Sequence, residues 1–360
     1  MDFGGIADIQ RAIPLEERPP LTYLFPWSKK KGGEFADMNI ETSKLETSTK
    51  NLERQSNKKK YNLQRNQKKL AAIFMAPWVI GFLAFSLYPI IATGYYGFTE
   101  FNLFDAPRWI GLDNFKEMIH DSEFYTSLFN TLYYVIFGVG LQLFAALITA
   151  LLLNMKVKGR AFYRAVYFLP SIMPPVAGAL LWVWLLNPKY GLVNAVLGFF
   201  NLSQPLWLSS AEWAKPAIIL MSLWGVGSTM LIYLAGLGDI PSGYYEAVEI
   251  DGGGMLSKFR HVTWPLLTPI TLFQIISGVI AGFNVFTQSF VISSAGTGNA
   301  PLGGIKNSLL FYAVNIYQQA FSYLKFGYAS ALSWVMLIII LIVTMLILKS
   351  SKKWVYYEGE

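Results

Sequence analysis

The sequence predicts an all-α membrane protein with about six transmembrane helices and a short cytoplasmic helix between the fourth and the fifth. Hydrophobic residues make up 54% of the chain and charged residues only 14%, a balance far from that of soluble domains. The mean hydropathy is +0.39, and apolar runs of about 20 residues recur along the chain. A run of that length crosses a hydrocarbon core of roughly 30 Å as a helix, because a backbone in lipid must satisfy its own polar groups.

The chain opens with a polar segment, residues 1–69, which contains the lysine runs Lys29–Lys31 and Lys58–Lys60. Its composition is typical of a largely disordered cytoplasmic extension, and a basic patch that touches anionic lipid is the alternative. The transmembrane part covers residues 70–349, and a cytoplasmic tail covers 350–360. The predicted spans lie at about 70–98, 127–154, 166–186, 216–237, 266–292 and 326–348.

Prolines interrupt two of these runs without disqualifying them. Pro77 and Pro89 lie in the first run, and Pro170, Pro174 and Pro175 lie in the third. Packed transmembrane helices tolerate proline, so each run is interpreted as one span. Aromatic residues near the span ends are interpreted mostly as anchors at the membrane interface. These are Trp109, Trp182, Trp184, Trp207, Trp213, Trp354, Tyr356 and Tyr357.

The distribution of Lys and Arg predicts the orientation. The lysine-rich stretch before residue 70, the basic cluster at 156–164, Lys258 with Arg260, and the C-terminal lysines all fall on one side of the predicted spans. The opposite side carries only scattered Lys and Arg residues. The richer side is cytoplasmic by the positive-inside rule. Both termini are therefore predicted on the cytoplasmic side of a bacterial plasma membrane, which requires an even number of spans.

Several classes of function are disfavoured by what the chain lacks. None of the six runs contains Asp, Glu, Lys, Arg or His, whereas ion-coupled transporters usually hold an ionisable residue at membrane depth. The chain has no phosphate-binding Gly-x-x-x-x-Gly-Lys-Ser/Thr loop, no cysteine and only 2 histidines, which are far apart. We therefore predict no catalytic residue, no metal site and no cofactor, and we place the energy source in another protein. The net charge of +7 is not interpreted as nucleic-acid binding, because it follows membrane topology.

The polar segment 238–264 is the only long cytoplasmic connection between the predicted spans. Pro241 and Ser242 predict the start of a helix, with Ser242 as the N-cap, and Glu246 and Ala247 continue it. Glycines at 252–254 predict an abrupt end and permit close backbone approach. A short helix on the membrane face, followed by a turn into the fifth span, could seat in a cleft of a partner.

This segment resembles the motif of ABC-importer permeases, Glu-Ala-Ala, three residues, Gly, nine residues, Ile-x-Leu-Pro. The match runs from Glu246-Ala247-Val248 through Gly252 to Val262-x-Trp264-Pro265, with complete spacing and with Val, Val and Trp in place of Ala, Ile and Leu. The resemblance implies a coupling helix that contacts a cytoplasmic ATPase dimer, which binds the ATP and Mg²⁺. The residues that it places at this contact are Tyr245, Glu246, Ala247, Asp251, Gly252 and Pro265.

Other segments resemble more narrowly the first of the two paired permeases in carbohydrate importers of the maltose and glycerol-phosphate type. They are Gly111–Phe115, Asn130–Leu132, Phe162–Pro170 and Gly327–Ser333, and the resemblance covers about 70–355. It implies a second homologous permease, an extracytoplasmic sugar-binding protein, and a pore that alternates its access between the two sides of the membrane.

Amides beside aromatic rings in the spans are candidates for contact with a sugar, which has hydroxyl groups and apolar ring faces. In the fifth run, Asn284 and Gln288 are four residues apart and would share a helix face, close to Phe283. Tyr233 and Thr229 in the fourth run are weaker candidates. The alternative role for these amides is to form hydrogen bonds between neighbouring helices.

Two other functions stay open. One is an ABC permease for a different polar solute, although a cationic solute would need carboxylates that the spans lack. The other is a carrier or channel that works alone. Such a protein would give the 246–252 segment no role and should tolerate a bulky residue at Gly252.

Overall fold

The computed structural model describes residues 48, 70–155, 158–295 and 302–357, and it is all-α apart from one small β-ribbon in these ranges. Four helical segments are long and apolar enough to cross a membrane, namely Leu70–Tyr96, Ser122–Asn154, Met255–Ser294 and Phe326–Ser351. Two bent helix pairs bring the total to six if each pair forms one span. The predicted fold class is confirmed. The proposed extension at 1–69 lies outside the described residues except for Ser48.

The chain divides into two units at Leu83 and Ala84, and the part from Ala84 onward forms one bundle. The first span ends in the π-helical turn η3 (Leu83–Leu87) and helix α3 (Tyr88–Tyr96). Strands β1 (Thr99–Glu100) and β2 (Arg108–Trp109) then pair antiparallel, and α4 (Asp113–His120) follows. Asn114 holds this region together, because its amide donates to the carbonyls of Gly97 and Thr99, each at 2.9 Å.

The second span is continuous from α5 (Ser122–Tyr133) through the π-helical turn η4 (Tyr134–Val139) to α6 (Gly140–Asn154). The third run is not one straight helix, which corrects the expectation for 166–186. Helices α7 (Arg160–Phe168) and η5 (Leu169–Ile172) meet α8 (Pro175–Leu185) at 101°. The cause is the Pro174-Pro175 pair, since a residue before proline is pushed into extended geometry. Met173 and Pro174 have ψ angles of 136° and 130°.

The connection between the third and fourth predicted spans, 187–215, contains α9 (Leu192–Phe199) and η6 (Trp207–Ser209). Trp207 is buried and donates from Nε1 to Asn194 at 2.7 Å, so it closes this loop and is not an interfacial anchor. The fourth run is also bent, by 46°, between α10 (Ala214–Trp224) and α11 (Gly227–Gly238). Ser171 bridges the bend, because it accepts from the Ser228 N–H at 3.2 Å and donates to the Gly225 carbonyl at 3.4 Å.

The predicted short helix exists as α12 (Ser242–Ile250), and α13 (Met255–Lys258) and η7 (Phe259–Thr263) lead from it into α14 (Trp264–Phe283). The expectation of one helix over 266–292 is wrong in detail. The backbone breaks at 284–286 before α15 (Thr287–Ala295) begins. Residues 296–301 lie outside the described ranges, and η8 (Ile305–Asn307), α16 (Tyr312–Tyr317), η9 (Gln318–Ser322) and α17 (Phe326–Ser351) come after them.

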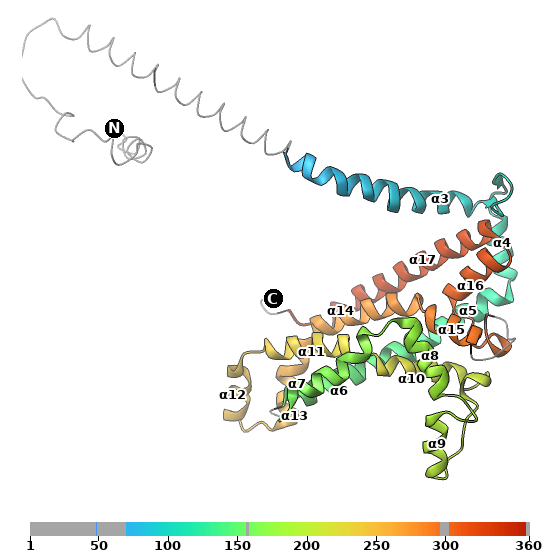
Figure 1. Cartoon of the computed structure of the whole chain (residues 1–360). Coiled ribbons are helices and arrows are strands. Elements are labelled where there is room, and N and C mark those ends of the chain that lie inside the picture. The colour runs from blue at the N-terminus through green and yellow to red at the C-terminus, as the bar shows by residue number, and fades with distance from the viewer. Residues whose placement is uncertain (1–47, 49–69, 156–157, 296–301, 358–360) are drawn as a thin grey trace, which may run out of the picture. The chain divides into compact units, whose positions relative to one another are not determined.

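Small residues let the helices of the bundle approach closely. A Cβ on Gly278 or Gly282 of α14 would lie 2.6 Å or 2.9 Å from the side chains of Val139 and Val135 in η4. The pair therefore serves packing inside this chain. In Figure 1, α12 and α13 lie at one end of this bundle, and α4, α5 and α16 lie at the other.

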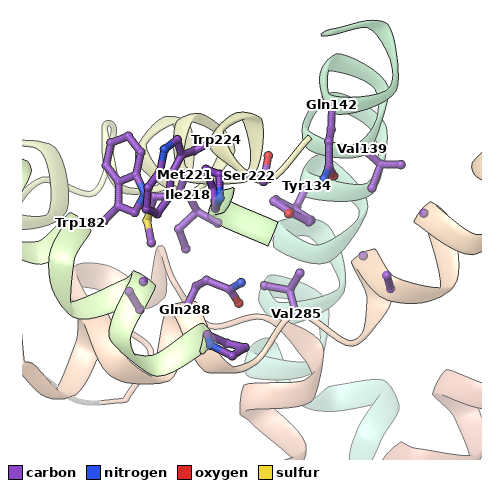
Figure 2. Close-up of a pocket in the computed structure, with 18 of the residues that line it drawn as sticks. Tyr134, Val139, Gln142, Trp182, Ile218, Met221, Ser222, Trp224, Val285 and Gln288 are labelled. Carbon is purple, nitrogen blue, oxygen red and sulfur yellow. The ribbon is translucent and has the colours of Figure 1, made fainter. Parts of the chain in front are cut away.

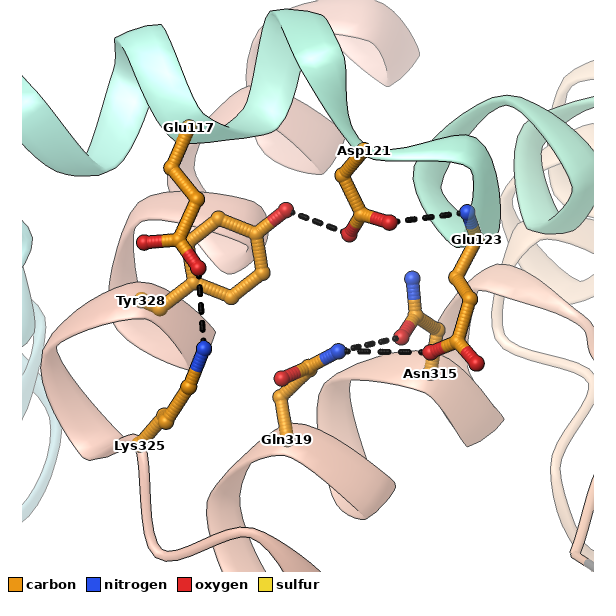
Figure 3. Close-up of polar contacts among 7 residues, drawn as sticks. All are labelled: Glu117, Asp121, Glu123, Asn315, Gln319, Lys325 and Tyr328. Carbon is orange, nitrogen blue, oxygen red and sulfur yellow. Dashed lines mark hydrogen bonds and ion pairs between the residues drawn. The ribbon is translucent and has the colours of Figure 1, made fainter.

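A polar network occupies the end of the bundle opposite α12 (Figure 3). Lys325 pairs with Glu117 at 2.9 Å, and the Tyr328 hydroxyl donates to Asp121 at 2.7 Å. The Gln319 side-chain amide donates to Oδ1 of Asn315 at 3.4 Å. Nearby, the Tyr312 hydroxyl donates to the Leu332 carbonyl at 3.0 Å, and burial raises the pKa of this tyrosine. The Glu117 and Asp121 contacts join α4 and the residue after it to the start of α17, and the Tyr312 bond joins α16 to α17.

Gly327 packs directly against the backbone of Thr99 and leaves no room for a side chain. A Cβ there would lie 2.0 Å from the Thr99 carbonyl oxygen, and backbone cannot move aside cheaply. We expect Gly327→Ala to lower the free energy of unfolding by about 1–3 kcal/mol through overpacking. Thermal unfolding in detergent measures this. Gly238→Ala is the matched control, because a Cβ there meets nothing within 4 Å. Equal unfolding temperatures for the two variants would contradict the prediction.

Candidate functional site

The turn after α12 is built around Gly252. This residue has φ of +77°, a left-handed conformation that favours glycine. Its N–H donates to the Glu249 carbonyl at 3.0 Å, and the Gly253 N–H donates to the Val248 carbonyl at 2.8 Å. These two bonds form a Schellman motif, which ends α12 sharply and sets the direction in which the chain leaves it. The glycine of the sequence motif is therefore the residue that fixes the angle between α12 and α13.

The N-terminal end of α12 differs from the expectation. Pro241 occupies the N-cap position and Ser242 is already the first helical residue, so the Ser242 hydroxyl makes no capping bond. Proline at this position costs little, because the N-terminal N–H groups of a helix lack partners within the helix. The prediction that Ser242 caps the helix is wrong, although the start of the helix is where the sequence placed it.

Two contacts tie α12 back to the chain that follows it. The Tyr245 hydroxyl and the Thr263 hydroxyl lie 3.1 Å apart in a hydrogen bond, and Glu249 forms an ion pair with Lys258. These contacts make α12 and α13 a braced unit at the end of the bundle. Tyr245 is therefore an internal brace as well as a predicted contact residue. Pro265 is half-buried at the start of α14.

The outer surface of this braced unit is exposed and strongly apolar. Glu246, Ala247, Asp251 and Gly252 are all exposed. Beside them, large hydrophobic side chains stand mostly in the open, with exposed fractions of 86% for Ile250, 76% for Met255 and 79% for Leu256. Exposed large hydrophobic side chains beside polar residues are typical of a protein–protein contact. We call the surface made by Glu246, Ala247, Ile250, Asp251, Gly252, Met255 and Leu256 the coupling surface.

A cavity of about 390 Å³ lies inside the bundle. Its walls come from η4, α6, α8, α10 and the broken region between α14 and α15. Figure 2 shows Gln288 pointing into this space, with Ile218 and Val285 beside it. The bends in the third and fourth runs and the break at Asn284 all border the cavity, because Pro175, Gly225 and Asn284 line it.

The polar groups in the cavity are all without formal charge at neutral pH. Amides come from Gln142, Asn284 and Gln288, and aromatic groups come from Tyr134, Trp182 and Trp224. The two indole rings are arranged edge to face, with centroids 5.9 Å apart. The Trp182 Nε1 atom is buried and has no hydrogen-bond partner among the described residues, so it can donate to a ligand. Asn284 donates its amide N–H to the Ile280 carbonyl at 2.8 Å, which leaves its oxygen for other contacts.

The five predicted pathway residues are divided between two environments. Asn284 and Gln288 line the cavity, although the helix break means that they do not share a helical face. Phe283 is fully buried behind them, and Tyr233 lies in a separate core cluster with α6 and α14. The Thr229 carbonyl accepts from Gln274 at 3.3 Å, which ties α11 to α14. Gln274 therefore hydrogen-bonds α14 to α11 and does not line the cavity.

The sequence analysis missed most of the residues that line the cavity, among them Gln142, Trp182, Ser222 and Trp224. Trp182 was expected to anchor the membrane interface, but it faces the cavity with Trp224, while Trp184 is the exposed residue of the pair. Ser222 was not considered. Gln142 could have been found, because it is the one amide in the apolar run 135–153. Such a side chain needs a polar partner or a cavity.

No group of His, Cys, Asp and Glu in the described ranges could hold a metal ion. The candidate site consists of an uncharged cavity inside the bundle and the coupling surface at one end of it. The cavity can bind a polar solute, and the coupling surface can contact another protein.

Comparison with known proteins identifies close relatives. The probable ABC transporter permease protein YesP of Bacillus subtilis is 43% identical over 290 residues, which cover 80% of this chain and 92% of that protein. The arabinooligosaccharides transport system permease protein AraP of the same organism is 32% identical over 291 residues, which cover 80% and 89%. The trehalose/maltose transport system permease protein MalF of Thermococcus litoralis is 30% identical over 292 residues, which cover 81% and 96%.

The fold is also known. A chain in the crystal structure of a bacterial alginate ABC transporter, in complex with an alginate pentasaccharide-bound periplasmic protein, superposes with a TM-score of 0.70 at 20% identity. The match covers 80% of this chain and 96% of that one. The sequence profile of the family described as binding-protein-dependent transport system inner membrane component matches residues 142–356, which include most of the cavity lining, the coupling surface and α17. The chain belongs to this family of ABC transporter permeases.

Proposed function

We propose that this chain forms one half of the translocation pathway of an ABC importer for a sugar or oligosaccharide. The observation that carries the proposal is the cavity, whose lining combines three amides, two indole rings and the unpartnered Trp182 N–H, without a formal charge. Sugar hydroxyls pair with amides and indole N–H groups, and the apolar faces of sugar rings stack on aromatic side chains. The names of AraP and MalF, which specify arabinooligosaccharides and trehalose/maltose, support the same class of substrate.

The proposed orientation puts the coupling surface and both termini in the cytoplasm. The basic clusters of the sequence fall on the same side of the spans as α12, in agreement with the positive-inside rule. The loops at 97–121 and 187–213 and the segment 302–311 then face outward, where an extracytoplasmic binding protein delivers the sugar.

In this mechanism the chain performs no covalent chemistry and binds no cofactor. A cytoplasmic ATPase dimer holds ATP and Mg²⁺, and its closure moves α12 through the coupling surface. Because the Tyr245–Thr263 bond and the Glu249–Lys258 ion pair brace α12 against the start of α14, that motion passes into the helix whose break lines the cavity. A second, homologous permease supplies the other wall, and the pair exposes the cavity alternately to each side.

The cavity assignment is tested with Gln288→Ala. We expect the KM for sugar uptake to rise about five- to tenfold with little change in the maximal rate, because a neutral hydrogen bond contributes about 1 kcal/mol and 1.4 kcal/mol corresponds to a factor of ten. The measurement is uptake of radiolabelled oligosaccharide by proteoliposomes that contain the whole importer.

Gln274→Leu is the matched control, since Gln274 is an amide of the same region whose bond runs to the Thr229 carbonyl and not into the cavity. This control should leave the KM unchanged. An unchanged KM in Gln288→Ala, with normal uptake, would show that the sugar passes elsewhere.

A further inference from the structure

A second pocket, of about 430 Å³, lies at the end of the bundle opposite the coupling surface. It is open to the outside and is bounded by α5, the start of α10 and η8. Two lysines, Lys215 and Lys306, line it together with Asn130, Ser308 and the aromatic ring of Phe129. We call it the lysine pocket. The cavity already described has no cation in its lining, so the two sites differ in chemistry.

Lys215 is held in place without a counter-charge. Its Nζ atom donates to Asn130 Oδ1 at 3.0 Å and lies 5.3 Å from the ring centroids of both Phe129 and Tyr133. Within the described ranges no carboxylate lies at ion-pair distance from it. An ammonium group has three donors, and only one is used here. Two aromatic faces and one amide therefore fix a half-buried cation whose remaining donors are free for a ligand.

The opposite wall supplies a second cation and an unused hydroxyl. Lys306 is exposed and forms no ion pair in the part of the chain that the structure describes. Ser308 is 7% exposed, and its Oγ atom has no hydrogen-bond partner among the described residues. A buried hydroxyl without a partner loses about 1–3 kcal/mol, so a ligand that satisfies it is favoured. Asn130 organises both walls, because its amide also donates to the Asn307 and Leu310 carbonyls at 2.9 and 3.0 Å.

We propose that the lysine pocket binds a carboxylate of the incoming oligosaccharide, so that the substrate is an acidic sugar that contains a hexuronate. The proposal rests on the proposed function, because it names the class of sugar for that importer. Two uncompensated ammonium groups and a hydroxyl attract an anion. The Phe129 and Tyr125 rings beside them, with exposed fractions of 62% and 52%, offer faces for the sugar ring.

The pocket is placed to pass such a sugar onward. It shares two walls with the cavity, because Asn130 lies four residues before Tyr134, and Lys215 lies three residues before Ile218. Both of these later residues line the cavity. The cationic site captures the acidic group at the outward end, and the amides of the cavity then donate to it during passage.

The test uses proteoliposomes with the complete importer and two trisaccharides of equal length. One contains a hexuronate, and in the other its carboxyl is reduced to a primary alcohol. We expect Lys215→Gln to raise the KM for the acidic trisaccharide about tenfold and Lys306→Gln to raise it about threefold, because Lys306 is exposed and screened. The KM for the reduced trisaccharide should stay the same in both variants. Lys189→Gln, an exposed lysine outside both pockets, is the matched control and should change neither KM.

Each other outcome overturns the assignment. If both trisaccharides lose uptake equally and the concentration of binding protein that gives half-maximal uptake rises, the carboxylate belongs to the binding protein and not to the sugar. If neither lysine variant changes the KM for the acidic sugar, the pocket binds no substrate group. If the wild-type importer takes up neither trisaccharide nor any other oligosaccharide tried, the proposed function fails as well. In the first two outcomes only the assignment of the lysine pocket fails, because the wild-type importer still takes up sugar.

Discussion

Replacing Gly252 with valine is expected to reduce sugar uptake at least tenfold while the bundle remains folded. The φ of +77° at this position costs a residue with a Cβ about 1–2 kcal/mol, and a β-branched residue more. The turn relieves that strain by changing its angle, which moves the coupling surface relative to the rest of the bundle. Because 1.4 kcal/mol corresponds to a factor of ten, this strain should reduce the population of permease with a docked ATPase about tenfold.

The geometry of the same turn supplies the control. A Cβ on Gly252 or on Gly254 would meet nothing within 4 Å, but Gly254 has φ of −84° and accepts alanine without strain. Gly254→Ala should keep uptake and should keep the ATPase bound after detergent extraction. If Gly252→Val transports as well as Gly254→Ala does, α12 has no part in coupling. A carrier that works alone would give that result.

The spans could be predicted from the sequence because their signal is local. An apolar run near 20 residues long has few alternatives in a membrane, and the last span was placed well, with α17 covering Phe326–Ser351. The bends were not predicted. Pro174 and Pro175 were visible, but proline in a packed transmembrane helix is often tolerated without a break. Whether it bends the chain by 101° depends on the space around it, which a single sequence does not reveal.

The candidate site was predicted unevenly for the same reason. Gly252 was found because a left-handed turn restricts its residue type strongly, and its motif has fixed spacing. Asn284 and Gln288 were found by their polarity, but the reason given, a shared helical face, does not hold because the helix ends at Phe283. Trp182 was missed because an indole near a span end fits a membrane interface as well as a cavity. Trp224 lies inside the predicted fourth run and was not considered.

Replacing Asn130 with alanine is expected to lower the free energy of unfolding by about 3 kcal/mol or more. Asn130 is 2% exposed and makes three hydrogen bonds, to the carbonyls of Asn307 and Leu310 and to Lys215. Its loss leaves those groups without a partner at a buried site, at about 1–3 kcal/mol for each buried group left unpaired. The backbone at Lys306 and Asn307 adds to the effect, because both have positive φ, of 50° and 56°, and depend on outside contacts to stay there.

Thermal unfolding of the purified permease in detergent measures this effect, which should lower the unfolding temperature by roughly 5–10 °C. Thr149→Ala in the same long helix is the control, since its hydroxyl bonds only to the Ala145 carbonyl one turn earlier, and it should shift the temperature by no more than a degree or two.

Asn130→Ala and Lys215→Gln together distinguish the structural role of the lysine pocket from its role in sugar specificity. Asn130→Ala releases both walls of the lysine pocket at once, so it should impair uptake of acidic and neutral sugars together, whereas Lys215→Gln removes only the cation. An Asn130→Ala permease as stable as the wild type would mean that the 306–310 segment holds its conformation without α5, and the pocket would then lack the rigidity that its selectivity requires.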